Sequence, residues 1–282
     1  MKVIECPRDA MQALHDFTPT EKKIDYINQL LKVGFDTIDF GSFVSPKAIP
    51  QMRDTAEVLA GLELSETKSK LLAIIANLRG AEQAASFDEI NYLGFPLSIS
   101  ETFQQRNTNK SIGEAMIQLS EIQNLCKRTG KTLVTYISMG FGNPYGEEFN
   151  AEIVQRFVQD LANFEVEIIS LSDTIGVADS QIIKEIFETS ITAYPTIEFG
   201  AHFHSTPQTT REKIEAALEA GCERFDSAIK GFGGCPMAKD ELTGNVATEK
   251  LLAILAEHQV SPKYDVQAFN ESMIKSLEVF PS

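Results

Sequence analysis

Positive charge is scarce in this chain of 282 residues, which has 25 Lys and Arg against 40 Asp and Glu and a formal net charge of −15. Such a field repels polyanions, so the charge argues against nucleic acid and anionic membranes as partners. An anionic small molecule would need a local cluster of Lys and Arg, or a metal ion, to offset the general field.

The chain also lacks long apolar runs. No apolar stretch reaches the roughly 18 residues that a transmembrane helix needs, and Met1 to Asp9 has neither the apolar core nor the cleavage site of a signal peptide. The four cysteines show no CxxC spacing. Without an export signal, we expect reduced thiols and a cytoplasmic protein.

Short β-rich runs alternate with longer helical patterns along the chain. The run 71–75 is continuous and apolar, as expected of a strand covered on both faces, and Gly34 is the expected cap of a preceding helix. Strands are predicted near 2–5, 36–40, 71–75, 90–98, 131–138, 165–171, 196–203 and 223–229. Helices are predicted near 20–33, 50–60, 79–86, 111–129, 149–164, 179–193, 206–220 and 246–259, with one more over 265–278.

Eight strand–helix units in series predict an α/β fold, a (β/α)8 TIM barrel with an additional C-terminal helix. The length of 282 residues is normal for such a barrel. An open doubly wound sheet is the alternative, but it usually needs fewer strands and an identifiable crevice. Because no linker or low-complexity segment interrupts the pattern, we expect one catalytic domain over residues 1–282.

Barrel enzymes place their chemistry at the carboxyl ends of the strands. Polar residues follow the predicted strands of this chain with unusual consistency. They are Arg8, Asp9, Asp39, Asn77, Glu101, Asp173, His202, His204 and the loop 230–236.

His202 and His204 are two of only four histidines and stand two residues apart in a segment that is predicted to be a buried strand. Side chains alternate faces along a strand, so both imidazoles point the same way. Two neutral imidazoles on one face suit a divalent metal. The alternative is a pair of hydrogen-bonded core histidines.

A carboxylate and an amide oxygen would complete a plausible ligand set. Asp9 follows the first strand, although an Asp there is often a helix cap or turn residue. Asn245 could supply the amide, but taken by itself it is better explained as the cap of the next helix. Mixed nitrogen and oxygen ligands suit Mg²⁺, Mn²⁺ or Zn²⁺.

Two further features have a catalytic and a structural interpretation. Arg8 could stabilise an oxyanion, or it could only pair with the neighbouring carboxylate. The glycine-rich loop 231–236 carries Cys235 at its tip. A thiol on a mobile lid could donate a proton or shield a site, but a lone cysteine is more often inert.

Together these residues resemble the 3-hydroxy-3-methylglutaryl-CoA lyase family, which is related to isopropylmalate and homocitrate synthases. The similarity runs over nearly the whole chain, and its more specific signals are Ser42–Lys47 and Gly233–Pro236. The segments that carry it are 7–12, 41–52, 172–176, 201–204, 231–236 and 244–249.

The resemblance implies a set of site residues. The metal ligands would be Asp9, His202, His204 and Asn245. Arg8 would stabilise the enolate of the departing acetyl thioester, Cys235 would be a catalytic lid residue, and Asp39 stands where the family has Glu. Substrate-site positions are matched by Gln12 and Asp173.

The implied reaction is a retro-Claisen cleavage of 3-hydroxy-3-methylglutaryl-CoA to acetyl-CoA and acetoacetate. A divalent metal, with Mg²⁺ or Mn²⁺ as the first candidates, would make the tertiary hydroxyl of the substrate more acidic. His202 and Cys235 are the candidates for moving protons. The implied partner is an acyl-CoA substrate, and we expect a homodimer acting in leucine degradation.

The chain differs from the family pattern close to the substrate and the lid. Ala10 and Met11 replace Gly-Leu, and the loop between Cys235 and Asn245 is one residue longer. Asp39 is one methylene shorter than the family's Glu, Val134 replaces an arginine, and Ser205 replaces an aspartate.

Three alternatives to this activity remain to be weighed. The first alternative is a related lyase or aldolase acting on another 3-hydroxyacyl-CoA or hydroxy-keto acid. A metal-dependent hydrolase would carry its His-x-His on the first strand, not the seventh. A non-catalytic barrel that binds an acyl-CoA has no need of four ligands, Arg8 and Cys235 together.

Overall fold

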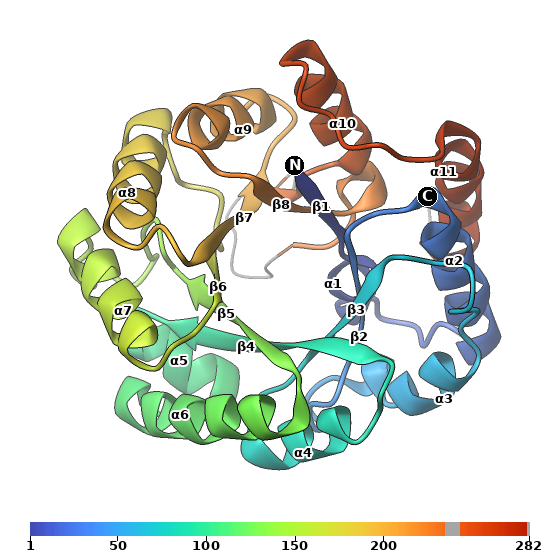
Figure 1. Cartoon of the computed structure of the whole chain (residues 1–282), viewed down its shortest axis with the longest axis horizontal. Helices are drawn as coiled ribbons and strands as arrows, with labels where there is room; N and C mark the ends of the chain where they lie inside the picture. Colours follow the sequence, from blue (N-terminus) through green and yellow to red (C-terminus); the bar gives the residue numbers. More distant parts are fainter. Residues whose placement is uncertain (235–242, 281–282) are drawn as a thin grey trace.

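Eight parallel strands close into a barrel with helices around the outside (Figure 1). The computed structural model describes residues 1–234 and 243–280. The strands pair in chain order, and β1 pairs with β8 to complete the circle. They are β1 (Lys2–Glu5), β2 (Thr37–Ser42), β3 (Lys70–Ile74), β4 (Ile90–Ser98), β5 (Thr132–Ser138), β6 (Ile168–Asp173), β7 (Glu198–Ser205) and β8 (Arg224–Ser227). The predicted (β/α)8 TIM barrel is therefore confirmed.

The helices form an outer ring whose inner faces cover the strands. The ring consists of α2 (Thr20–Val33), α3 (Thr55–Ala60), α4 (Leu78–Ala85), α6 (Ile112–Thr129), α7 (Ala151–Asn163), α8 (Ser180–Ala193), α9 (Thr210–Glu219) and α10 (Thr248–Glu257). Shorter elements lie at the strand ends: α1 (Pro7–Gln12), η1 (Pro50–Met52), α5 (Glu101–Thr108), η2 (Ile229–Gly231) and the two-residue strand β9 (Gly244–Asn245).

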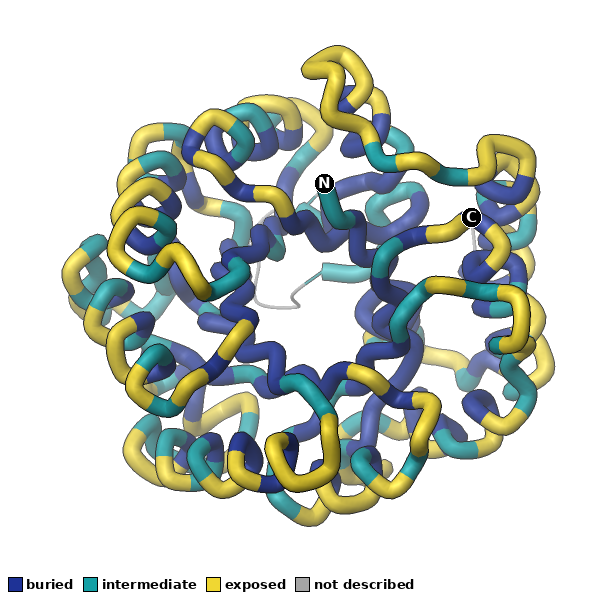
Figure 2. The backbone as a smooth tube through the Cα atoms, in the orientation of Figure 1, coloured by how far each residue is buried: buried dark blue, intermediate teal, exposed yellow. Residues whose placement is uncertain are grey.

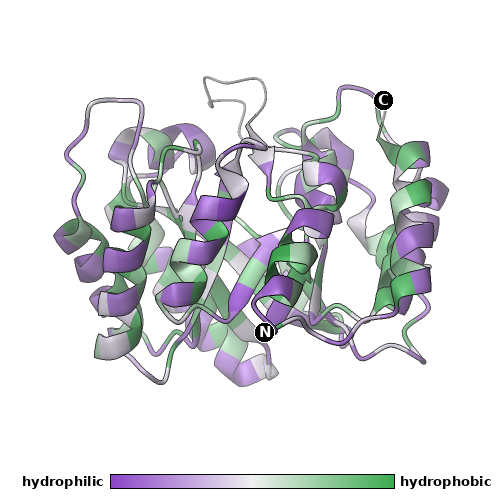
Figure 3. Cartoon of the chain, turned by 90° about the horizontal axis from the view of Figure 1, so that it is seen from above, coloured by the Kyte–Doolittle hydropathy of each residue, from purple (hydrophilic) through white to green (hydrophobic). Residues whose placement is uncertain are grey.

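The main core lies between the barrel wall and this ring. Helix α7 shows why: Val154, Val158 and Leu161 recur at helical spacing and are all fully buried against the sheet. Each such side chain contributes on the order of 1.5–3 kcal/mol when removed from water. Figure 2 shows the buried wall and the exposed outer turns, and Figure 3 shows the hydrophilic and hydrophobic stripes of the helices.

A second, smaller apolar cluster contains Leu72, Tyr92, Val134, Tyr136 and Ile168. These residues come from β3, β4, β5 and β6, and their alternation with the outward-facing core residues places them inside the barrel. The interior is therefore packed with side chains, and chemistry is confined to its ends.

The additional C-terminal helix is also confirmed. Helix α11 (Val266–Val279) packs beside α2 (Figure 1), where Gln29 Nε2 donates a hydrogen bond of 3.1 Å to the Ala268 carbonyl. The Phe280 ring meets the Tyr26 ring edge-on at 5.8 Å. Among the described residues, no helix is both long and apolar enough to cross a membrane.

Two short helices were not predicted. Helix α1 has only six residues, and the eight residues of α5 are mostly polar, so neither segment shows a hydrophobic period. Their start signals were present: Pro7 occupies the first turn of α1, and the Ser100 hydroxyl accepts a hydrogen bond from Phe103 N at the start of α5. Gly34 ends α2 with a φ of 85°, as predicted.

Glu5, at the end of β1, is a fully buried carboxyl group. Its Oε1 accepts a hydrogen bond of 2.9 Å from Ile229 N, and its Oε2 accepts one of 2.6 Å from the Thr248 hydroxyl. Burial raises the pKa of Glu5 from 4.5 to about 8, although the two hydrogen bonds oppose this shift.

We expect Glu5→Gln to stabilise the protein near pH 8 and to change little near pH 5. The folded pKa exceeds the unfolded one, so the native protein retains a proton that the unfolded chain releases; stability therefore falls as pH rises from about 4.5 to about 8. At roughly 1.4 kcal/mol per pKa unit, the effect amounts to a few kcal/mol. Urea unfolding across this pH range measures it, with the exposed Glu66→Gln as the control. An unchanged pH profile in Glu5→Gln would contradict the assignment.

Candidate metal centre and active site

Three possible metal ligands converge at the carboxyl end of the barrel. Helix α1 begins directly after β1 and carries Asp9, while His202 and His204 project from one face of β7. One potential ligand atom from each of the three residues lies within 4.8 Å of the other two. The two imidazole rings are 5.3 Å apart, centre to centre. The closed barrel thus brings Asp9, which follows the first strand, next to the two histidines of the seventh strand, as expected.

His204 has a fixed ring orientation. Its Nδ1 lies 2.7 Å from the Thr174 carbonyl oxygen, which can only accept, so Nδ1 carries the proton. Nε2 is then left with its lone pair, and it is buried without a hydrogen-bond partner among the described residues. Burial and the neighbouring His202 lower the pKa of His204, which favours the neutral ring that a metal requires.

His202 is oriented by Asp226, a residue that the sequence analysis did not single out. The His202 Nδ1 lies 3.0 Å from Asp226 Oδ2 on β8. Burial opposes protonation of His202, but the Asp226 hydrogen bond and charge outweigh it and raise the pKa. A carboxylate on Nδ1 is a common support for a histidine that ligates a metal through Nε2. The available signal was the polar Asp226 inside a predicted strand.

Asn245 does not cap the following helix, so that sequence interpretation is wrong. Helix α10 begins after Ala247 with no side-chain cap, and Asn245 lies in β9, paired antiparallel with His204. Its Nδ2 donates hydrogen bonds of 2.8 Å to Asp9 Oδ2 and to the Phe232 carbonyl. The amide therefore belongs to the same cluster. Coordination would require it to turn Oδ1 toward the ion.

Arg8 is almost saturated by its neighbours. Its Nη1 donates to Asp9 Oδ1 at 2.9 Å and to Gln12 Oε1 at 2.8 Å. Its Nε and Nη2 both donate to Asp39, with Nη2–Oδ2 at 2.5 Å. Of the five N–H groups of a guanidinium, one on Nη2 has no acceptor among the described residues.

The carboxylates on the two sides of Arg8 differ in acidity. Burial opposes ionisation of Asp9, but the charges of Arg8, His202 and His204 lower its pKa to about 2. Burial dominates at Asp39 and raises its pKa to about 6, despite Arg8. Asp9 is thus a permanent anion at the mouth, whereas the pKa of Asp39 lies within reach of neutral pH.

Other predicted rim residues are placed differently. Asp173 is buried behind His204, where both carboxylate oxygens accept hydrogen bonds from protein donors. Asn77 caps α4 through Gly80 N, and Glu101 accepts from Ile112 N. These two are local structural contacts. Cys235 lies outside the described residues.

The donor set fits a divalent cation. It offers one carboxylate of low pKa, two imidazoles with their Nδ1 atoms engaged elsewhere, and an amide within hydrogen-bonding distance of that carboxylate. The buried and unpaired Nε2 of His204 is costly unless something binds it. Mixed nitrogen and oxygen ligands of this kind are typical of Mg²⁺, Mn²⁺ or Zn²⁺ sites.

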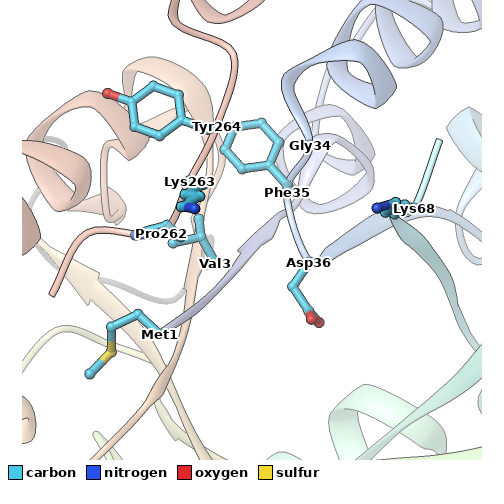
Figure 4. Close-up of a pocket in the computed structure, with 9 residues that line it drawn as sticks. All are labelled: Met1, Val3, Gly34, Phe35, Asp36, Lys68, Pro262, Lys263 and Tyr264. Atoms are coloured by element: carbon cyan, nitrogen blue, oxygen red, sulfur yellow. The ribbon is translucent and has the colours of Figure 1, made fainter. Parts of the chain in front are cut away.

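A separate pocket lies at the opposite end of the barrel (Figure 4). It is lined by residues that precede strands, such as Phe35 and Lys68, and by the segment before α11, including Lys263 and Tyr264. In barrels of this type that end serves stability, not chemistry. Both lysines are exposed. The pocket is not part of the candidate site.

Comparison with known proteins gives consistent results. The model of a family described as HMGL-like matches residues 4–273. The chain is 35% identical over 254 residues to the hydroxymethylglutaryl-CoA lyase YngG of Bacillus subtilis, covering 90% of this chain and 84% of that protein. It is 33% identical over 262 residues to the 3-hydroxy-3-isohexenylglutaryl-CoA/hydroxymethylglutaryl-CoA lyase of Pseudomonas aeruginosa, covering 93% and 86%.

Similarity to solved structures extends over the whole barrel. The crystal structure of the Bacillus subtilis HMG-CoA lyase superposes with a TM-score of 0.92 at 31% identity. The match covers 100% of this chain and 95% of that one.

We expect Mn²⁺ to raise the thermal midpoint of the wild-type protein and to have little effect on Asp9→Asn. Ion binding to the native state alone adds about 2.7 kcal/mol of stability at a concentration a hundred times Kd. Asn keeps the shape of Asp9 but removes the anionic ligand. Differential scanning calorimetry with and without Mn²⁺ measures the shift. The exposed Asp16→Asn is the control and should respond like wild type. If Mn²⁺ raised the thermal midpoint of Asp9→Asn as much as that of the wild type, Asp9 would be excluded as a ligand.

Proposed function

Because the chain belongs to the HMGL-like family, we propose that it is a divalent-metal-dependent carbon–carbon lyase that cleaves 3-hydroxy-3-methylglutaryl-CoA to acetyl-CoA and acetoacetate. The observation that carries this proposal is the unpaired, buried Nε2 of His204 beside Asp9 and His202, with Arg8 in contact with the same carboxylate. A cation can make a substrate hydroxyl more acidic and a fixed guanidinium can stabilise a developing enolate, and a retro-Claisen cleavage can use both effects.

The residues that would hold the ion are Asp9, His202, His204 and Asn245. A bound Mg²⁺ or Mn²⁺ would supply Lewis acidity, lowering the pKa of a substrate hydroxyl at the site. Zn²⁺ is compatible with the same donors. Asp226 and the Thr174 carbonyl would keep the two rings turned toward the ion, since each engages Nδ1 and leaves Nε2 for coordination.

Arg8 is suited to stabilise the enolate of the departing thioester. Four of its N–H groups anchor it to Asp9, Gln12 and Asp39, so the guanidinium is held rigidly before the reaction begins. The remaining Nη2 proton can then point at the developing charge without reorganisation. In this account Gln12 contacts Arg8 and orients it, in addition to its predicted place near the substrate.

Proton transfer needs a group other than His202. If His202 binds the ion through Nε2 while Nδ1 donates to Asp226, no lone pair is left to accept a proton. The two roles predicted for His202 therefore exclude each other, and the geometry favours the ligand. Asp39, with a pKa of about 6, can accept a proton near neutral pH. Cys235 stays a predicted candidate for moving a proton.

The remaining predictions concern the context of the reaction. We assign residues 1–282 to one catalytic domain, since buried residues from β1 through α11 share one continuous core. A homodimer, a cytoplasmic location and a part in leucine degradation stay predictions. The alternative of a related lyase is kept only for other 3-hydroxyacyl-CoA substrates, because one relative is named for an isohexenylglutaryl-CoA substrate as well.

The direct test is to incubate the purified protein with 3-hydroxy-3-methylglutaryl-CoA and Mg²⁺ or Mn²⁺, with and without a chelator, and to quantify acetoacetate. We expect acetoacetate only in the samples without chelator, in which the metal is available to the protein. Cleavage of the isohexenyl analogue would give a longer 3-oxo acid in place of acetoacetate. Acetyl-CoA, the product common to both substrates, is therefore quantified to rank the two acyl groups by kcat/KM. Absence of product from both substrates with metal present would refute the proposed activity.

We expect Arg8→Ala to lower kcat by about a hundredfold or more, the usual cost of losing an oxyanion donor. Its Mn²⁺ affinity should not fall, because removing a positive charge beside Asp9 makes that carboxylate a better ligand. Steady-state kinetics and calorimetric Mn²⁺ titration separate the two effects. Turnover at the wild-type rate would remove Arg8 from the mechanism.

A further inference from the structure

Lys213, on α9, is a buried cation in direct contact with a proposed metal ligand. Its side chain is 2% exposed, and its Nζ donates to the His204 carbonyl oxygen at 3.0 Å and to Asp173 Oδ2 at 2.5 Å. Lysine is rarely buried unless it is paired, because an isolated charge in the interior costs several kcal/mol. The burial of Lys213 therefore depends on these two acceptors, Asp173 and the His204 carbonyl oxygen.

The Asp173 partner of Lys213 fixes the turn that follows β6. Asp173 Oδ1 accepts from Val177 N at 2.9 Å, and Oδ2 accepts from Ala178 N at 3.1 Å. The same turn contains Thr174, whose carbonyl oxygen holds the His204 Nδ1 proton at 2.7 Å. Lys213 is thus connected to His204 twice: directly at the backbone, and through Asp173 and the turn at the ring.

The turn also lies against His204 without room to spare. Gly176 in this turn has a φ of 73°, and a Cβ added there would lie 3.3 Å from the His204 carbonyl oxygen. Ser205, the residue after His204, is neutral and bonds to the Thr210 hydroxyl at 2.8 Å. Because Ser205 carries no charge, Asp173 is the carboxylate that pairs with Lys213 among the described residues.

We propose that Lys213 is a positioning residue: with Asp173 it sets both the position of the His204 backbone and the orientation of the His204 ring, so that Nε2 points at the ion. This inference rests on the metal site of the proposed function. Groups that orient metal ligands typically change metal affinity by 10- to 100-fold when they are removed. A role in stability alone would leave metal affinity unchanged.

The test compares Lys213→Met with a matched variant elsewhere in the chain. Lys23 is also 2% exposed and forms a buried ion pair of 2.7 Å with Asp54. Its other described contacts are the Gln51 carbonyl and the Phe17 ring, and none is a proposed ligand. Met keeps most of the lysine stem and removes its charge, so Lys23→Met reproduces the loss of a buried pair away from His204.

Two quantities are measured on metal-free protein: Mn²⁺ affinity by titration calorimetry, and unfolding by urea in the presence of chelator. We expect both variants to lose stability, but only Lys213→Met to bind Mn²⁺ at least about tenfold more weakly. Excess Mn²⁺ should restore turnover in Lys213→Met. Equal Mn²⁺ affinity in Lys213→Met and wild type would overturn the proposal.

A milder pair covers the case in which Lys213→Met does not fold. Lys213→Gln retains an amide that can donate to Asp173 or to the His204 carbonyl, and Lys23→Gln is its control. We expect weaker Mn²⁺ binding in Lys213→Gln than in Lys23→Gln, and equal binding would count against the proposal. Wild-type protein that binds no Mn²⁺ refutes the positioning role, whereas tight Mn²⁺ binding without acetoacetate formation refutes only the proposed reaction.

Discussion

The hydrogen bond between His204 Nδ1 and the Thr174 carbonyl oxygen determines what the barrel mouth can bind. A carbonyl accepts only, so this single contact fixes the tautomer of the ring and leaves the Nε2 lone pair facing Asp9 and His202. An unpaired nitrogen in a buried place raises the free energy of the folded protein. A divalent ion bound to Nε2 would offset this cost.

Charge around this atom is balanced by pairs and not by solvent. Arg8 lies between Asp9 and Asp39, Lys213 lies against Asp173, and His202 is engaged by Asp226. Removing one member of a buried pair leaves an uncompensated charge, typically at a cost of 3–5 kcal/mol. The site is consequently rigid before any ligand arrives. Such rigidity is what electrostatic stabilisation of a developing enolate requires.

Much of this could be read from the sequence because it depends on local periodicity. Alternating strand and helix patterns gave the barrel, and residues at strand ends gave Arg8, Asp9 and the two histidines at one rim. Short elements were missed for a physical reason: α1 has six residues, fewer than two helical turns, so no apolar period exists to be seen. Asn245 taken by itself was better explained as a cap, because its local sequence is compatible with that role, and only the family resemblance made it a predicted ligand.

The sequence by itself determined which donors are available and that strand ends bring them to one edge, since both follow from residue type and from the repeat of strand and helix. Only the tertiary structure decided which atoms meet. Asn245 contacts Asp9 across 236 positions, Lys213 contacts Asp173 across 40, and His202 contacts Asp226 across 24. These contacts depend on the register with which β7 pairs with β6, β8 and β9, and register is a property of the closed barrel, not of any one segment.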